Sequence, residues 1–142
     1  MRRTALALAA ALTLASCGGD DDGGLGGGTS FDSADDIAAE LGCDFQPGEP
    51  DNTFGTAPEE TGDCDVDGDA VSIDLYEDDE HLRQALRQAS TIGCGFAQAF
   101  GIDQFSYAAG ANWSVSPEDN LDEDFAAEIA DQLGGEAQTV EC

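Results

Sequence analysis

Residues 64–76 read CDVDGDAVSIDLY, and this stretch decides how the rest of the chain can fold. Asp67 and Gly68 form a dipeptide that favours the two-residue turn of a β-hairpin. With this turn, Cys64 lies opposite Val71 on the neighbouring strand. Because side chains alternate along a strand, the pairing predicts one buried face, whose members are Cys64, Val71, Ile73 and Leu75.

Helical patterns flank this hairpin on both sides. Ser33 is a typical helix N-cap and Gly42 a typical helix stop, which predicts a helix over 34–41. After the hairpin, the acidic run 77–80 opens a second helix, and residues 94–100 predict a further short one. The second helix has a half-buried stripe at i, i+3, i+4 and i+7 spacing, formed by Leu82, Ala85, Leu86 and Ala89.

A second hairpin is predicted over 105–115. Phe105 and Tyr107 lie on the same face as Trp113 only if the loop between the strands has an odd number of residues, because side chains alternate between faces. A three-residue loop at 109–111 satisfies this condition. Trp113 is therefore interpreted as a core residue rather than as a ligand platform.

The remaining elements complete the predicted architecture. Ser116 and Pro117 are a strong helix start, with Ser as the cap and Pro at the first position. Short strands are expected at 43–45 and 137–142. The last helix carries a four-spaced stripe of Leu121, Phe125, Ile129 and Leu133. The predicted class is α+β, with helices packed on one face of a mostly antiparallel sheet.

The N-terminus predicts export and lipid attachment. Two arginines precede an apolar run over 4–14. This run is too short to span a bilayer, because a spanning helix needs about 20 residues. The run ends Leu-Ala-Ser-Cys at 14–17, which resembles the lipobox of bacterial lipoproteins. The resemblance implies that residues 1–16 are a signal peptide and that Cys17 is acylated. The alternative is an ordinary secretory signal with an incidental cysteine.

The predicted mature chain is a tethered domain. Cys17 and the Gly/Asp-rich stretch that follows it, 17–30, form a flexible linker of roughly 20 Å, and 31–142 forms one acidic domain. With acylated Cys17 in the lipid bilayer, the domain is expected on the extracytoplasmic side of the cell membrane.

Four further cysteines, Cys43, Cys64, Cys94 and Cys142, are expected to form disulfides, because an even count outside the cytoplasm is typical of disulfide-stapled domains. Four cysteines allow three pairings. We predict Cys43–Cys64, which joins the first helix end to the hairpin, and Cys94–Cys142, which pins the last strand. A metal cluster is disfavoured, because the chain has no CxxC pair.

Charge limits the classes of partner. The chain holds 31 Asp and Glu against 4 Lys and Arg, with a formal net charge of −27. Such a field repels phosphates, so nucleic acid is excluded as a partner, whereas a cationic or protein partner would be attracted. The alternative interpretation of the charge is a solvated shell that keeps the protein soluble.

No catalytic, cofactor or metal residue is assigned. Asp63, Asp65 and Asp67 match the start of a calcium loop, but Asp74 stands where such a loop has Glu, and we interpret the segment as an acidic hairpin turn. His81 is expected to face solvent with a raised proton affinity. A Ser-His or Cys-His nucleophile is not indicated, and spacing locates no carboxylate pair.

Four short motifs resemble a set of small actinobacterial lipoproteins of unknown function: IAxxLG-C at 37–43, G-x-C at 62–64, G-x-N-W at 110–113 and LGG at 133–135. The resemblance implies a location and a fold, not an activity; a likeness to inhibitory modules of the β-lactamase-inhibitor type is topological only. The expected function is a membrane-anchored, non-catalytic binding module. The alternatives are an envelope hydrolase using a carboxylate pair and a low-affinity calcium-binding surface protein.

Overall fold

The central hairpin forms as the Asp-Gly turn predicts. The computed structural model describes residues 28–51, 55–118 and 122–142. Strands β2 (Glu60–Val66) and β3 (Asp69–Leu75) pair with Cys64 opposite Val71. Asp67 and Gly68 take positive φ angles of 57° and 97°, the conformation that a two-residue hairpin turn of this type needs.

This hairpin lies inside a six-stranded sheet in the order β1-β2-β3-β5-β4-β6, in which every pair of neighbours is antiparallel. The other elements are α1 (Ala34–Leu41), β1 (Gln46–Pro47), α2 (Asp79–Ala99), β4 (Gln104–Ala109), β5 (Trp113–Pro117), α3 (Glu123–Leu133) and β6 (Glu136–Glu141). The α+β class with an antiparallel sheet is therefore confirmed. No helix in the described ranges is long and apolar enough to cross a membrane.

The first helix begins and ends where the sequence predicts. The Ser33 side chain accepts a hydrogen bond from the Asp36 backbone N–H, and Gly42 takes the left-handed conformation with φ 72°. Ile37 and Leu41 are buried on one face of α1 and belong to the main core. These local signals act within a single turn of chain, so they do not depend on the rest of the fold.

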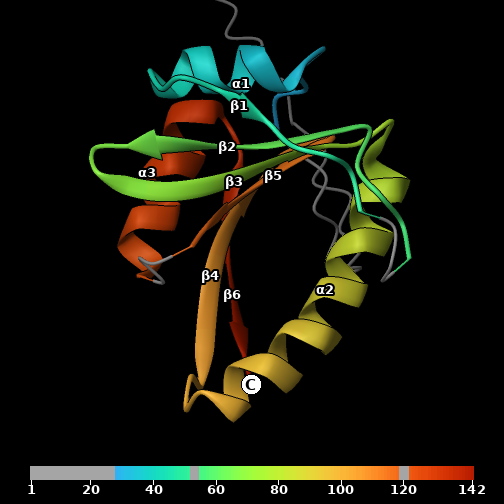
Figure 1. The fold of residues 1–142 in the computed structure, drawn as a ribbon, viewed down its shortest axis with the longest axis vertical. Helices are drawn as coiled ribbons and strands as arrows, with labels where there is room; N and C mark the ends of the chain where they lie inside the picture. Colours follow the sequence, from blue (N-terminus) through green and yellow to red (C-terminus); the bar gives the residue numbers. More distant parts are fainter. Residues whose placement is uncertain (1–27, 52–54, 119–121) are drawn as a thin grey trace, which may run out of the picture.

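The helices are divided between the two faces of the sheet (Figure 1). The expectation that helices share one face holds for α1 and α3, which bury Ile37 and Ile129 against Ile73 and Trp113. Helix α2 packs on the opposite face. Its core partners there are Tyr76, Tyr107 and Ala109, together with the partly buried Phe105 and Val140.

The register of β4 against β5 explains this division. Ala108 pairs with Val115 and Ala109 with Ser114, so an even number of residues, 110–113, separates the last pair, whereas the prediction needs an odd number. A change of one residue moves alternate side chains to the other face. Tyr107 therefore points toward α2, away from Trp113, and the predicted shared face was wrong.

Asn112 holds this tight loop. Its side-chain amide donates to the Phe31 carbonyl at 2.9 Å and its side-chain oxygen accepts from the Phe31 N–H at 3.1 Å. The Tyr76 backbone N–H also donates to the Asn112 carbonyl at 2.8 Å. These partners are far away in the sequence, so turn propensity alone did not predict the loop length.

The start of the last helix also differs from prediction. Ser116 and Pro117 lie in β5, paired with Ser72 and Val71, because a neighbouring strand satisfies their backbone. Helix α3 begins after Asp122, whose side chain accepts from the Asp124 N–H. Leu121, predicted in the α3 stripe, lies outside the described residues.

The predicted short helix at 94–100 is the second half of α2, which is continuous over Asp79–Ala99. The helix runs through Gly93 and Gly95, although each glycine destabilises a helix interior by about 1 kcal/mol. Gly93 lies against the Phe105 ring, where an added Cβ would be 3.1 Å from Cζ. Tertiary contact therefore overrides local propensity at this point.

Two disulfides connect the elements in the predicted pairing. Cys43–Cys64 joins the end of α1 to β2, and Cys94–Cys142 joins α2 to the residue after β6. At the second bridge the Gln98 side chain also donates to the Cys142 carbonyl at 2.5 Å. Helix α2 is thus fixed to the sheet edge at its C-terminal half.

The ordered domain includes residues before the predicted boundary at Phe31. The Thr29 N–H donates to the Gly134 carbonyl at 2.8 Å, and the Thr29 carbonyl accepts from Trp113 Nε1 at 2.7 Å. Thr29 is therefore part of the fold, although it was assigned to the tether. Cys17 and the signal sequence lie outside the described residues, and their assignment stays a prediction.

Candidate functional site

The candidate site is a cavity of about 490 Å³ between α2, the outer face of β2 and β3, and the described residues 49–51 and 55–58. Its volume falls in the range of about 300–1,000 Å³ that is typical of small-ligand sites. The described residues that line it are Glu49, Asp51, Gly55, Thr56, Pro58, Thr61, Asp74, Tyr76, Ala85, Gln88, Ala89, Ile92, Gly93 and Phe96.

Helix α2 is held to the sheet in both of its halves. Leu82 and Leu86, in the first half of α2, are buried with Tyr76 and Tyr107. The Cys94–Cys142 bridge fixes the other half. Between these anchors, Gln88, Ala89 and Ile92 of α2 line the cavity.

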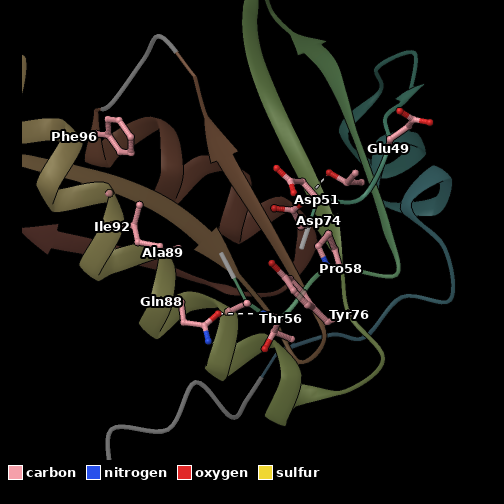
Figure 2. Close-up of a pocket in the computed structure, with 14 residues that line it drawn as sticks. Glu49, Asp51, Thr56, Pro58, Asp74, Tyr76, Gln88, Ala89, Ile92 and Phe96 are labelled. Atoms are coloured by element: carbon pink, nitrogen blue, oxygen red, sulfur yellow. Dashed lines mark hydrogen bonds between the residues drawn. The ribbon is translucent and has the colours of Figure 1, made fainter. Parts of the chain in front are cut away.

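Three of the lining residues, Glu49, Asp51 and Asp74, carry a carboxylate. In Figure 2, Asp51 and Asp74 point toward the same side of the cavity, whereas Ile92 and Phe96 lie further along α2. Among the described lining residues none is Lys, Arg or His. The cavity therefore combines an apolar helix face with a wall that attracts positive charge.

Asp74 is the most desolvated of these carboxylates. Burial raises the pKa of Asp74 above its ordinary value, and the nearby charge of Asp63 raises it further. The Thr61 hydroxyl donates to Asp74 Oδ1 at 2.7 Å, which stabilises the ionised form and opposes the shift. An ionised carboxylate here is destabilised unless a positive charge approaches it.

Two further contacts shape the cavity. Burial raises the pKa of Tyr76 above its ordinary value, and the charge of Asp74 raises it further. The Gln88 side chain accepts a hydrogen bond from the Thr56 N–H at 3.1 Å, which joins α2 to the loop before β2 (Figure 2). Phe96 is 62% exposed at the end of the lining.

The candidate calcium residues lie elsewhere. Asp63 and Asp65 are exposed on β2, and Asp65 accepts from the Gly68 N–H at 2.8 Å, as in a hairpin turn. Asp74 lines the cavity instead. Within residues 28–51, 55–118 and 122–142, no group of three or more His, Cys, Asp or Glu could hold a metal ion.

His81 lies at the start of α2, outside the cavity lining. Its Nδ1 is 2.7 Å from Asp78 Oδ1, and both side chains are about half exposed. The hydrogen bond to Asp78 raises the pKa of His81, followed by the charge of the same carboxylate. The predicted solvent-facing histidine with raised proton affinity is confirmed.

The sequence reasoning missed the cavity. Glu49 and Asp51 lie in a Pro-rich stretch that was interpreted as an irregular loop, and Thr61 was not singled out. Asp74 was noted only as a misfit in a calcium loop. Its position on β3 opposite Thr61 was a usable signal, because strand alternation places both on the face away from Ile73.

The four motifs that carry the family resemblance are structural. Gly110 and Gly135 both lie against the Trp113 ring, where an added Cβ would collide with it. Leu41 and Cys64 belong to the main core. The motifs therefore specify the core rather than the cavity.

Comparisons of the chain with protein-family models, with curated proteins and with solved structures found no match.

The buried carboxyl should make stability depend on pH. Because the pKa of Asp74 is higher in the folded chain, its ionisation weakens folding as pH rises from about 3.8 through the folded-state pKa. Asp74→Asn should therefore melt at a higher temperature than the wild type at pH 7, with the difference vanishing below pH 3.8. Thermal melts by circular dichroism test this.

The matched control is Glu128→Gln, which makes the same charge change at an exposed position on α3. A gain in melting temperature of the same size in both variants would show that relief of general charge repulsion, and not desolvation of Asp74, is the cause.

Proposed function

We propose that the chain is a membrane-anchored, extracytoplasmic lipoprotein whose folded domain is a non-catalytic binding module for a cationic or protein partner. The observation that carries the binding proposal is the cavity under α2, which has three carboxylates and no basic residue among its described lining residues. The net charge of −27 adds a long-range field that steers cations toward it.

Anchoring is supported by the Leu-Ala-Ser-Cys motif at 14–17, by which the chain resembles bacterial lipoproteins. Two acyl chains give stable membrane attachment where one is marginal. With a tether after Cys17, the cavity would be displayed at the envelope surface, where peptides and small molecules are accessible.

Cys17→Ala should abolish both acylation and stable membrane attachment. Expressed in a bacterium, the wild-type chain should incorporate labelled palmitate and sediment with membranes, whereas the variant should do neither. A matched Ser16→Ala variant keeps a small residue before the cysteine and should behave as the wild type. Membrane retention of Cys17→Ala would contradict lipid anchoring.

Binding is tested with a biotinylated penta-lysine peptide and a penta-glutamate control, using the full chain in a mild detergent. The lysine peptide should bind, and its association rate should fall as NaCl rises, because salt screens the field. Asp74→Asn should weaken binding more than Glu128→Gln does. Equal effects of the two variants, or equal binding of both peptides, would contradict a cation site in the cavity.

A further inference from the structure

The cavity has two chemically different walls, and together they select a type of cation. One wall is the apolar side of α2, formed by Ala85, Ala89 and Ile92. The other wall is formed by the sheet and carries Asp74, whose Oδ1 accepts a hydrogen bond from Thr61 of β2. A fitting ligand therefore needs an apolar stem and a single positive head group.

A bare metal ion fits poorly. Such an ion needs several oxygen ligands at once, and the described residues contain no group of three or more His, Cys, Asp or Glu side chains that could hold it. An apolar wall would also leave one side of the ion without ligands. An organic cation avoids both problems, because its stem replaces water along α2.

The hydrogen bonding of Asp74 distinguishes ammonium from guanidinium. A guanidinium group binds a carboxylate best through two parallel bonds that use both oxygens. Thr61 Oγ1 already donates to Oδ1 of Asp74 and takes one of its lone pairs, which narrows the directions from which a fork can reach both oxygens. The carboxylate retains acceptor capacity for a compact donor, and an ammonium group needs no fork geometry.

We infer that the cavity binds a protonated primary amine at the end of a short alkyl stem, with the ammonium at Asp74 and the stem against α2. This inference rests on the proposed function, because it names the ligand group of the same site. The group could belong to a free alkylamine or to a lysine side chain. The volume of about 490 Å³ has room for either.

The test is isothermal titration calorimetry of the full chain in mild detergent. The first pair of probes is n-pentylamine and n-pentanol. The second pair is the amides of lysine and arginine acetylated at the α-nitrogen, which keep their side-chain charge. Pentylamine should bind and pentanol should not, since they share the stem and differ in the charge. Binding of the lysine compound as well identifies a peptide as a possible source, and its failure to bind limits the site to free amines. An equal affinity for pentanol, or a higher affinity for the arginine compound, overturns the inference.

Two variants locate the site. Asp74→Asn should weaken pentylamine binding by about tenfold or more, the usual effect of losing a charge-assisted hydrogen bond. Ala89→Leu fills the apolar wall without a change of charge and should weaken binding too, whereas Glu128→Gln should change it less than about twofold. Circular dichroism checks that each variant is folded. Unchanged binding in both cavity variants overturns the inference.

The two proposals fail differently. If penta-lysine binds and Asp74→Asn weakens its binding, but neither pentylamine nor the lysine compound binds, the binding module stands and the inferred ammonium site is wrong. If neither binds, the binding proposal itself is wrong.

Discussion

Trp113→Ala should lower the free energy of unfolding by about 3–5 kcal/mol, the usual loss for truncating a buried aromatic residue. Trp113 is fully buried at the centre of the main core, where α1 and α3 cover the sheet. The Phe31 ring packs against it edge to face, with ring centroids 6.0 Å apart. A domain of this size is stable by about 5–15 kcal/mol, so the variant should lose a large fraction of its stability.

The loss has two parts that a second variant separates. Trp113 Nε1 donates to the Thr29 carbonyl at 2.7 Å, and this bond holds the first ordered residues against the domain. Trp113→Phe keeps most of the ring but removes the donor, and should destabilise by about 1–3 kcal/mol.

Urea unfolding followed by far-ultraviolet circular dichroism measures both variants, because tryptophan fluorescence is lost with the residue. In Trp113→Phe, hydrogen exchange should also become faster at Thr29 than in α1. A loss under 1 kcal/mol in Trp113→Ala would show that the residue is not the central core contact.

Removal of the Cys94–Cys142 bridge by a double Ser substitution should destabilise the domain by about 4 kcal/mol, and removal of Cys43–Cys64 by about 3 kcal/mol. The bridges close loops with sequence separations of 48 and 21, and a longer loop loses more unfolded-state entropy when it is cross-linked. The order of the two losses is therefore part of the prediction.

The Cys94–Cys142 variant should also affect the cavity. The bridge fixes the half of α2 that carries Ile92 and Phe96, and both residues line the cavity. Amide exchange in the C-terminal turns of α2 should rise, and pentylamine binding should weaken. The Cys43–Cys64 variant is the matched control, because its bridge packs at the main core, on the face of the sheet away from the cavity.

Peptide mapping without reductant checks the pairing first. A peptide that links Cys43 to Cys94 or to Cys142 would contradict it. Equal losses of stability for the two double variants would indicate that native-state effects outweigh loop entropy.

The sequence by itself determined the elements whose signals are local. The Asp67–Gly68 turn sets the register of β2 and β3, since a two-residue loop leaves one pairing. The caps Ser33 and Gly42 set the ends of α1 in the same way. The disulfide pairing also followed, because Cys43 comes just after α1 and Cys64 faces the core from the neighbouring hairpin.

Only the tertiary structure decided which face each later element covers. The β4–β5 loop is short because Asn112 bonds to Phe31 and Tyr76, residues 81 and 36 positions away. That register turns Tyr107 toward the second face and gives α2 a surface to pack on. The burial of Asp74 is likewise a tertiary property, since desolvation depends on what covers a group and not on its neighbours in the chain.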